Sequence, residues 1–254
     1  MMDHVDMDHV SAENLLSRVG ELRRSGMTAP QIARELGLTK AQVQPLLRQV
    51  AGSQRTAVAD RPLPEPADRE LLGCWISPGW SAGLGLDDAP EWAALDPDAG
   101  DGVGSGGLAA VMVARADRSS RVTLCGFLVD VYCLGVKNTL GPQTVSSGAV
   151  LDRTRAFFRA FPTPARPAPL ELAQQLVHGA VAYAAALGFT PHPEFADVAP
   201  YLGPPSGPCP IRFGLNGKPF YISGPRDRPG EVIATLERTA GAGNYDLLTH
   251  VPTL

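Results

Sequence analysis

The sequence has little of what marks secreted, membrane-bound or disulfide-stabilised proteins. No apolar run approaches the roughly 18 residues that a membrane-spanning helix needs, and the first ten residues, MMDHVDMDHV, are acidic. A secretory signal peptide begins with a basic segment followed by an apolar one. Four cysteines in 254 residues are too few for a disulfide scaffold, and none has CxxC or zinc-ligand spacing. We therefore expect a cytoplasmic protein without a membrane partner, whose cysteines are buried free thiols.

The common catalytic motifs are absent as well. The chain contains no GxSxG, HExxH, Walker or GxGxxG motif in the setting that each of them requires. The glycine-rich segment 100–107, GDGVGSGG, lacks the GxxxxGK[ST] pattern of a phosphate-binding loop and precedes a strand pattern. It predicts instead that residues 81–107 form a mobile surface insertion. The sequence thus indicates no specific reaction and no cofactor.

The composition of the chain is sufficient for a packed apolar core. Apolar residues make up 44% of the chain and charged residues 19%, while 27 glycines and 24 prolines require many irregular segments. Changes in composition along the chain predict four parts. These are a disordered tail over 1–10, a helical module over 11–51, an extended linker over 52–70 and a larger body over 71–254.

Residues 11–51 carry the pattern of three short helices. The apolar positions at helical spacing are Leu15, Val19, Leu22, Ile32, Leu36, Val43, Leu46, Leu47 and Val50. Thr28 with Gln31, and Thr39 with Gln42, have the spacing of a capping box, in which the first residue caps a helix and the second returns the hydrogen bond. A short helix, a glycine-containing turn and a second capped helix are typical of a helix-turn-helix.

The segment GMTAPQIARELGLTKAQVQPLLRQV resembles the DNA-binding domains of the resolvase and invertase type and of many bacterial regulators. In such domains the second helix of the motif enters the major groove of double-stranded DNA. Arg34 and Thr39 would then contact phosphate. The side chains that would face the DNA are Lys40, Gln42, Gln44 and Arg48.

The charge of the helical module supports DNA binding only locally. Acidic and basic residues balance over residues 1–50, but no acidic residue stands between Glu35 and Asp60. The third helix therefore has a positive face. Pro45 departs from the pattern, because a proline inside a helix removes a backbone hydrogen bond and kinks the helix or costs about 3 kcal/mol. A three-helix module that binds proteins instead of DNA stays an alternative.

The sequence of the body, residues 71–254, predicts an α+β fold with antiparallel hairpins and packed helices. Residues 108–114 and 122–131 read as the strands of one hairpin, and residues 211–214 and 220–224 as a second hairpin with an Asn-Gly turn. The expected helices cover residues 151–161, 170–187 and 231–239. This order of elements is typical of the α+β class.

A carboxylate and two histidines are the candidate catalytic groups of the body. Asp130 stands in an apolar strand, so it needs a cation, a metal or backbone donors beside it, or a raised pKa. Lys137 and Asn138 are its nearest candidate partners in the sequence, and pinning the following turn is the structural alternative. His178 lies on the helix over 170–187, and His192 lies between two prolines beside Glu194. His192 is a candidate base or metal ligand, or else a capping group.

The strings GFLVDVYCLGVK, HGAVAY and GFTPHPEF in the body resemble those of a group of bacterial proteins without an assigned activity, which implies a shared fold and nothing more. Three functions follow from the sequence. The first is a DNA-binding transcriptional regulator whose body senses an unidentified effector, forms a homodimer or binds a partner. The second is a nuclease-like enzyme that uses Asp130, His178, His192 and Glu194 with a divalent metal. The third is a protein-interaction adaptor that binds no DNA.

Overall fold

The computed structural model describes residues 6–60, 62–86, 90–97, 99 and 106–249. It divides into two compact units, Met1–Pro62 and Leu63–Leu254, which we call unit 1 and unit 2. Helices and a five-stranded antiparallel sheet confirm the expected α+β class. Over the described ranges, no helix combines the length and the apolar character needed to cross a membrane.

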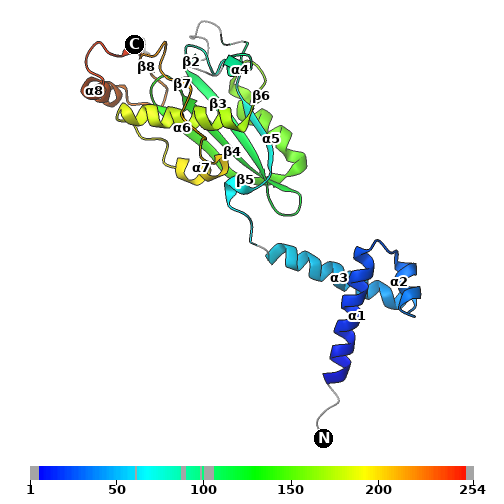
Figure 1. The fold of residues 1–254 in the computed structure, drawn as a ribbon. Helices are drawn as coiled ribbons and strands as arrows, with labels where there is room; N and C mark the ends of the chain where they lie inside the picture. Colours follow the sequence, from blue (N-terminus) through cyan, green and yellow to red (C-terminus); the bar gives the residue numbers. More distant parts are fainter. Residues whose placement is uncertain (1–5, 61, 87–89, 98, 100–105, 250–254) are drawn as a thin grey trace. The chain divides into compact units, whose positions relative to one another are not determined.

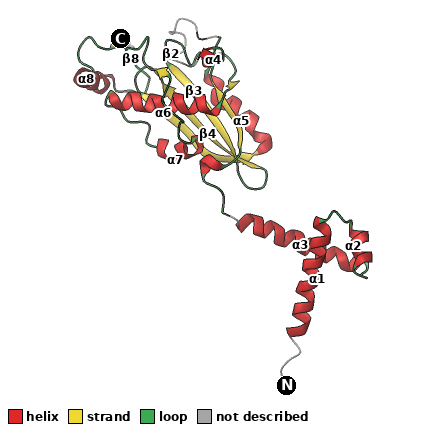
Figure 2. Ribbon diagram, in the orientation of Figure 1, coloured by secondary structure: helices red, strands yellow, loops and turns green. Residues whose placement is uncertain are grey.

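Unit 1 consists of three helices, α1 (Asp6–Arg24), α2 (Ala29–Glu35) and α3 (Lys40–Asp60) (Figure 2). Their apolar faces meet in a small core. Its buried members are Val19, Ile32, Ala33 and Val43, with Leu22, Met27, Leu36, Leu38, Leu46, Leu47 and Val50 packed around them. Gly26 and Gly37 end α1 and α2 with positive φ angles of 87° and 65°, which glycine adopts without strain.

Two expectations for unit 1 are corrected by the helix bounds. The tail expected to be disordered over 1–10 is helical from Asp6 onward, and residues 1–5 lie outside the described part. Helix α3 continues to Asp60, so the first half of the expected linker over 52–70 is helical. The sequence between Gly52 and Asp60 contains alanine, glutamine and arginine but no proline, and this composition favours continuation of the helix.

Pro45 lies inside α3, as the sequence predicts, and the helix runs through it. Proline lacks the N–H that would donate to the carbonyl four residues earlier, so the Ala41 carbonyl loses its intrahelical donor. The ring of Pro45 is exposed, and packing of the opposite face of α3 against α1 and α2 offsets the cost.

Unit 2 is built on a sheet with strand order β5-β4-β3-β1-β6, in which every neighbouring pair is antiparallel (Figure 1). The strands are β1 (Leu71–Ile76), β3 (Leu108–Ala116), β4 (Arg121–Asp130), β5 (Gly135–Ser146) and β6 (Arg166–Pro167). The predicted hairpin of residues 108–131 is thereby confirmed as β3 and β4. Ser119 and Ser120 turn it with φ angles of 52° and 64°.

Helices cover both faces of this sheet. One face packs against α6 (Leu170–Ala186) and α7 (Phe195–Leu202), and the other packs against α5 (Val150–Phe157) and the 3-10 helix η3 (Phe158–Ala160). Figure 2 shows α6 running across the strands. A β-carbon at Gly126 of β4 would come within 2.7 Å of the Phe157 ring, so this glycine makes room for α5 on the second face.

The segment expected as a mobile insertion over 81–107 is in part a packed component of unit 2. Strand β2 (Gly85–Leu86) pairs with β7 (Ile211–Arg212), and α4 (Pro90–Ala93) brings Trp92 into the core. The buried carboxylate of Asp96 accepts hydrogen bonds from the backbone N–H groups of Gly79 and Ser81 at 2.7 and 2.9 Å. The glycine-rich stretch 100–105 lies outside the described residues.

The second predicted hairpin is wrong, although its turn exists. Asn216 and Gly217 have the positive φ angles of a tight turn, 53° and 82°, but only one bridge, from Leu215 to Lys218, forms across it. The flanking strands diverge into different sheets. While β7 pairs with β2, β8 (Phe220–Ile222) pairs in parallel with β9 (Asp246–Leu248), and α8 (Pro229–Thr239) joins the last two. Pro219 has no N–H to extend the hairpin ladder.

Candidate functional site

The first turns of α2 and α3 are held by the predicted threonine–glutamine pairs. At α3 the Thr39 backbone N–H donates to Gln42 Oε1 at 2.9 Å, and the Gln42 N–H donates to Thr39 Oγ1 at 3.3 Å. At α2 the Thr28 N–H donates to Gln31 Oε1 at 2.7 Å. These bonds satisfy backbone donors that a helix start leaves free, and they fix where α3 begins.

The six side chains predicted to meet DNA are all exposed. They are Arg34, Thr39, Lys40, Gln42, Gln44 and Arg48. Lys40, Gln44 and Arg48 follow one another at intervals of four residues, so they share one exposed face of α3, while Val43, about 100° around the helix from Gln44, is buried. The arrangement leaves this face open to a partner along two turns of helix.

Gln42 has less freedom than its neighbours. Its amide oxygen accepts hydrogen bonds from both the Thr39 N–H and the Thr39 hydroxyl, at 2.9 and 2.8 Å. Only its NH₂ group is left to donate to a base or a phosphate. In this structure Gln42 positions the start of α3, and Lys40, Gln44 and Arg48 form the exposed row along the helix.

The exposed face of α3 is positive. Within the described residues neither Lys40 nor Arg48 forms an ion pair, and the sequence of α3 holds no acidic residue before Asp60. In contrast, Arg18 on α1 is neutralised by Glu21 at 2.9 Å. Unpaired cations on one helix face attract the phosphate backbone of nucleic acids.

Asp130 is buried at the end of β4, with an exposed fraction of 4%. Its Oδ1 accepts hydrogen bonds from the backbone N–H groups of Tyr132 and Cys133 at 3.0 and 2.9 Å, so it pins the turn that leads into β5. Burial raises the pKa of Asp130 to about 6, and Lys137 and the backbone donors oppose that rise. The structure thus confirms the backbone donors and Lys137 as its surroundings. Asn138 is exposed and bonds to the Thr139 N–H.

The other candidate catalytic residues have separate structural contacts. His178 Nε2 lies 2.9 Å from the Gly203 carbonyl oxygen, and its ring meets Phe195 edge-on at 6.0 Å. His192 ties the start of α7 to β5, because its N–H donates to the Val136 carbonyl at 2.9 Å and its Nδ1 lies 3.4 Å from the Glu194 nitrogen. These contacts are those of packing and capping groups.

The predicted catalytic set is not assembled into one centre. In the part of the chain that the structure describes, no hydrogen bond or ion pair joins Asp130 to His178, His192 or Glu194. Nor do three histidine, cysteine, aspartate or glutamate side chains come together there in a way that would hold a metal ion. Glu194 instead lies 3.5 Å from the Thr139 hydroxyl on β5.

Asp130, Lys137, Tyr221 and Asp227 form a polar cluster, of which the sequence had indicated Asp130 and Lys137 but neither Tyr221 nor Asp227. Lys137 Nζ lies 2.7 Å from Asp227 Oδ2, and both side chains are largely buried, with exposed fractions of 18% and 11%. The Gly224 N–H donates to the same Asp227 oxygen at 2.8 Å. Burial, together with the Asp227 carboxylate, raises the pKa of Tyr221 to about 12. The cluster therefore joins β4 and β5 to the segment before α8.

The same cluster disfavours a reactive cysteine. Burial and the Asp130 carboxylate both raise the pKa of Cys133, so its thiol stays protonated near neutral pH. Burial also raises the pKa values of Cys74 and Cys125 to about 12. Three of the four cysteines are thus the buried free thiols that the sequence predicts, and Cys209 is the exception, because it is exposed.

Comparison with known proteins gives no relative for either unit. The chain matches no protein-family profile, no curated protein and no solved structure.

Proposed function

We propose that unit 1 binds double-stranded DNA through the exposed face of α3, and that the protein is a transcriptional regulator. The observation that carries this proposal is the open row of Lys40, Gln44 and Arg48 beyond a firmly capped helix start. A helix that enters the major groove needs a fixed N-terminus, an unobstructed polar face and cations for the phosphates. The face of α3 combines all three features.

The test compares the full chain with the double variant Lys40→Gln/Arg48→Gln. A fluorescein-labelled pool of duplexes of about 30 base pairs, with a randomised centre, is titrated by anisotropy between about 50 and 200 mM salt. Each lost phosphate contact lowers the slope of log affinity against log salt concentration by about one. The double variant is therefore expected to have a slope smaller by about two and to bind roughly tenfold more weakly at the lower salt concentration.

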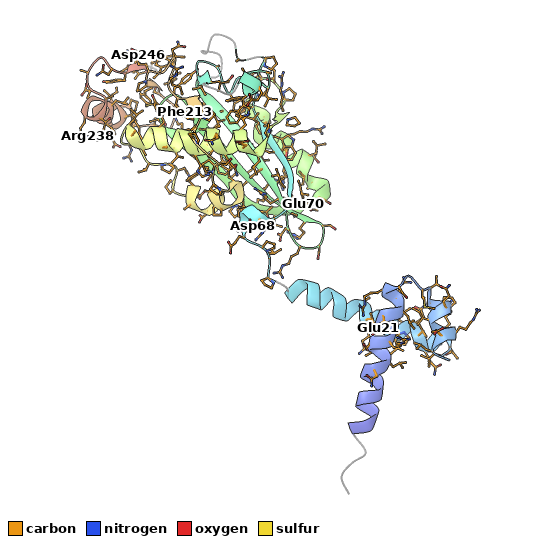
Figure 3. The ribbon with its side chains drawn as sticks, viewed as in Figure 1. Glu21, Asp68, Glu70, Phe213, Arg238 and Asp246 are labelled. Atoms are coloured by element: carbon orange, nitrogen blue, oxygen red, sulfur yellow. The ribbon has the colours of Figure 1, made fainter. Side chains whose placement is uncertain are left out.

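The matched control removes the same number of positive charges elsewhere. Arg18→Gln/Arg238→Gln leaves α3 untouched, since Arg18 lies on α1 and Arg238 lies on α8. Figure 3 labels Arg238. This control is expected to bind as the unaltered chain does. An equal loss in both double variants would contradict a specific role of α3. Absence of binding to any duplex at low salt would make unit 1 a protein contact, and cleavage on addition of Mg²⁺ would point to the nuclease alternative.

A further inference from the structure

Unit 2 contains a cavity of about 450 Å³ on the sheet face that carries α5. Its wall is formed by one side of α5 and η3, by the chain that follows η3, and by one residue of β1. The lining residues are Trp75, Leu151, Thr154, Arg155, Phe158, Arg159, Phe161, Pro162, Thr163, Pro164 and Ala165. A volume of this size is typical of sites that bind small organic molecules.

The aromatic part of the cavity wall is held by contacts within the protein. A β-carbon at Gly73 would collide with the indole of Trp75, so this glycine lets the indole lie across β1. Phe158 is buried and meets Phe157 edge-on at 5.0 Å. Thr154 also lines the cavity and is buried, with its hydroxyl 3.5 Å from Met112 Sδ. These contacts fix the aromatic side chains, so a ligand meets a largely preformed surface.

The charged side of the same cavity is positive. Arg155 and Arg159 lie one helical turn apart and both line it, and the sequence from Arg153 to Pro169 contains no acidic residue. Among the described residues, the one ion-pair partner of Arg155 is Asp152, at 3.9 Å, and both side chains are mostly exposed. Such an ion pair is weak. Arg159 forms no ion pair within the described residues. Two guanidinium groups are thus available to an incoming anion.

We propose that this cavity binds a small organic acid whose apolar body packs against Trp75, Phe158 and Phe161 and whose carboxylate is held by Arg155 and Arg159. A guanidinium group matches a carboxylate in geometry and charge, whereas an uncharged amide of the same shape gains no charge-assisted hydrogen bond. The site lies wholly within unit 2. It therefore does not depend on the DNA binding proposed for unit 1.

The test is calorimetric titration of the full chain with 1-naphthylacetate and with its neutral counterpart, 1-naphthylacetamide. Saturable binding of the acid in the micromolar range is expected, with the amide at least about tenfold weaker, which is the usual effect of one charge-assisted hydrogen bond. The double variant Arg155→Gln/Arg159→Gln should lower the affinity for the acid to that for the amide. Leu151→Trp, an added bulk at an exposed lining position, should weaken both ligands.

Arg153→Gln is the matched control, because Arg153 is an exposed arginine of α5 outside the cavity lining. This variant should bind the acid and the amide with affinities within about twofold of those of the unaltered chain. Three results would overturn the proposal. The first is no saturable binding of the acid, the second is equal affinity for acid and amide, and the third is an acid affinity that survives both the double arginine variant and Leu151→Trp.

Discussion

Replacement of Lys137 by methionine is expected to destabilise unit 2 by about 3–5 kcal/mol at pH 8, the usual cost of removing one partner from a buried ion pair. The ammonium group lies 2.7 Å from the Asp227 carboxylate and also lowers the pKa of the buried Asp130. Methionine keeps most of the side-chain volume but leaves two carboxylates without their cation. Denaturant unfolding, followed by the fluorescence of the buried Trp80 and Trp92, measures the loss.

The control for this variant is Lys218→Met. Lys218 pairs with Asp246 at a similar distance, 2.8 Å, but the two side chains are 41% and 60% exposed. An exposed pair contributes about 0–1 kcal/mol. Similar losses of stability in the two lysine variants would show that burial of the Lys137–Asp227 pair does not set its energetic importance.

Replacement of Asp130 by asparagine is expected to stabilise unit 2 at neutral pH. The pKa of Asp130 is about 6 in the folded protein, against about 3.9 in an unfolded chain. Between these values the folded state binds more protons, so the free energy of unfolding falls as the pH rises from about 4 to about 6. Ionisation of Asp130 thus costs about 3 kcal/mol above pH 6, and the asparagine variant avoids this cost.

The measurement is the free energy of unfolding of both proteins from pH 4 to pH 8. Their difference isolates Asp130, because the other titrating groups are shared. It should be near zero at pH 4 and should reach about 3 kcal/mol in favour of the variant by pH 7. Asparagine keeps an oxygen to accept from the Tyr132 and Cys133 N–H groups, so the turn is retained. A difference that does not change with pH would refute the raised pKa.

The parts of the structure that could be predicted from the sequence are those set by neighbouring residues. The caps of α2 and α3 depend on residues three apart, and the β3–β4 hairpin depends on two apolar strands around a short turn. The backbone donors of Asp130 are two and three residues away from it. Local patterns of this kind can be predicted from a single sequence, and they also predicted which face of α3 is exposed.

The parts that could not be predicted depend on distant contacts. Strand β5 contains Gly135, Gly141 and Pro142 and has little intrinsic preference for a strand. It forms because β4 pairs along its length and α6 and α7 pack against it. Asp227 stands in a loop of ordinary composition, and nothing nearby in the sequence indicates its pairing with Lys137. The sequence signal of the cavity was the alternation of Arg155 and Arg159 with the phenylalanines of residues 157–161.

The Lys137–Asp227 pair also has a consequence for the order in which unit 2 folds. Its two residues are 90 positions apart, so the pair closes a long loop whose entropy must be lost before any contact compensates for it. The hairpins of the sheet close much shorter loops and are expected to form first. The segment around Asp227 therefore docks late, after the folding transition state. Loss of this pair should accelerate unfolding while leaving the folding rate nearly unchanged. The polar cluster therefore contributes to the kinetic stability of the native protein.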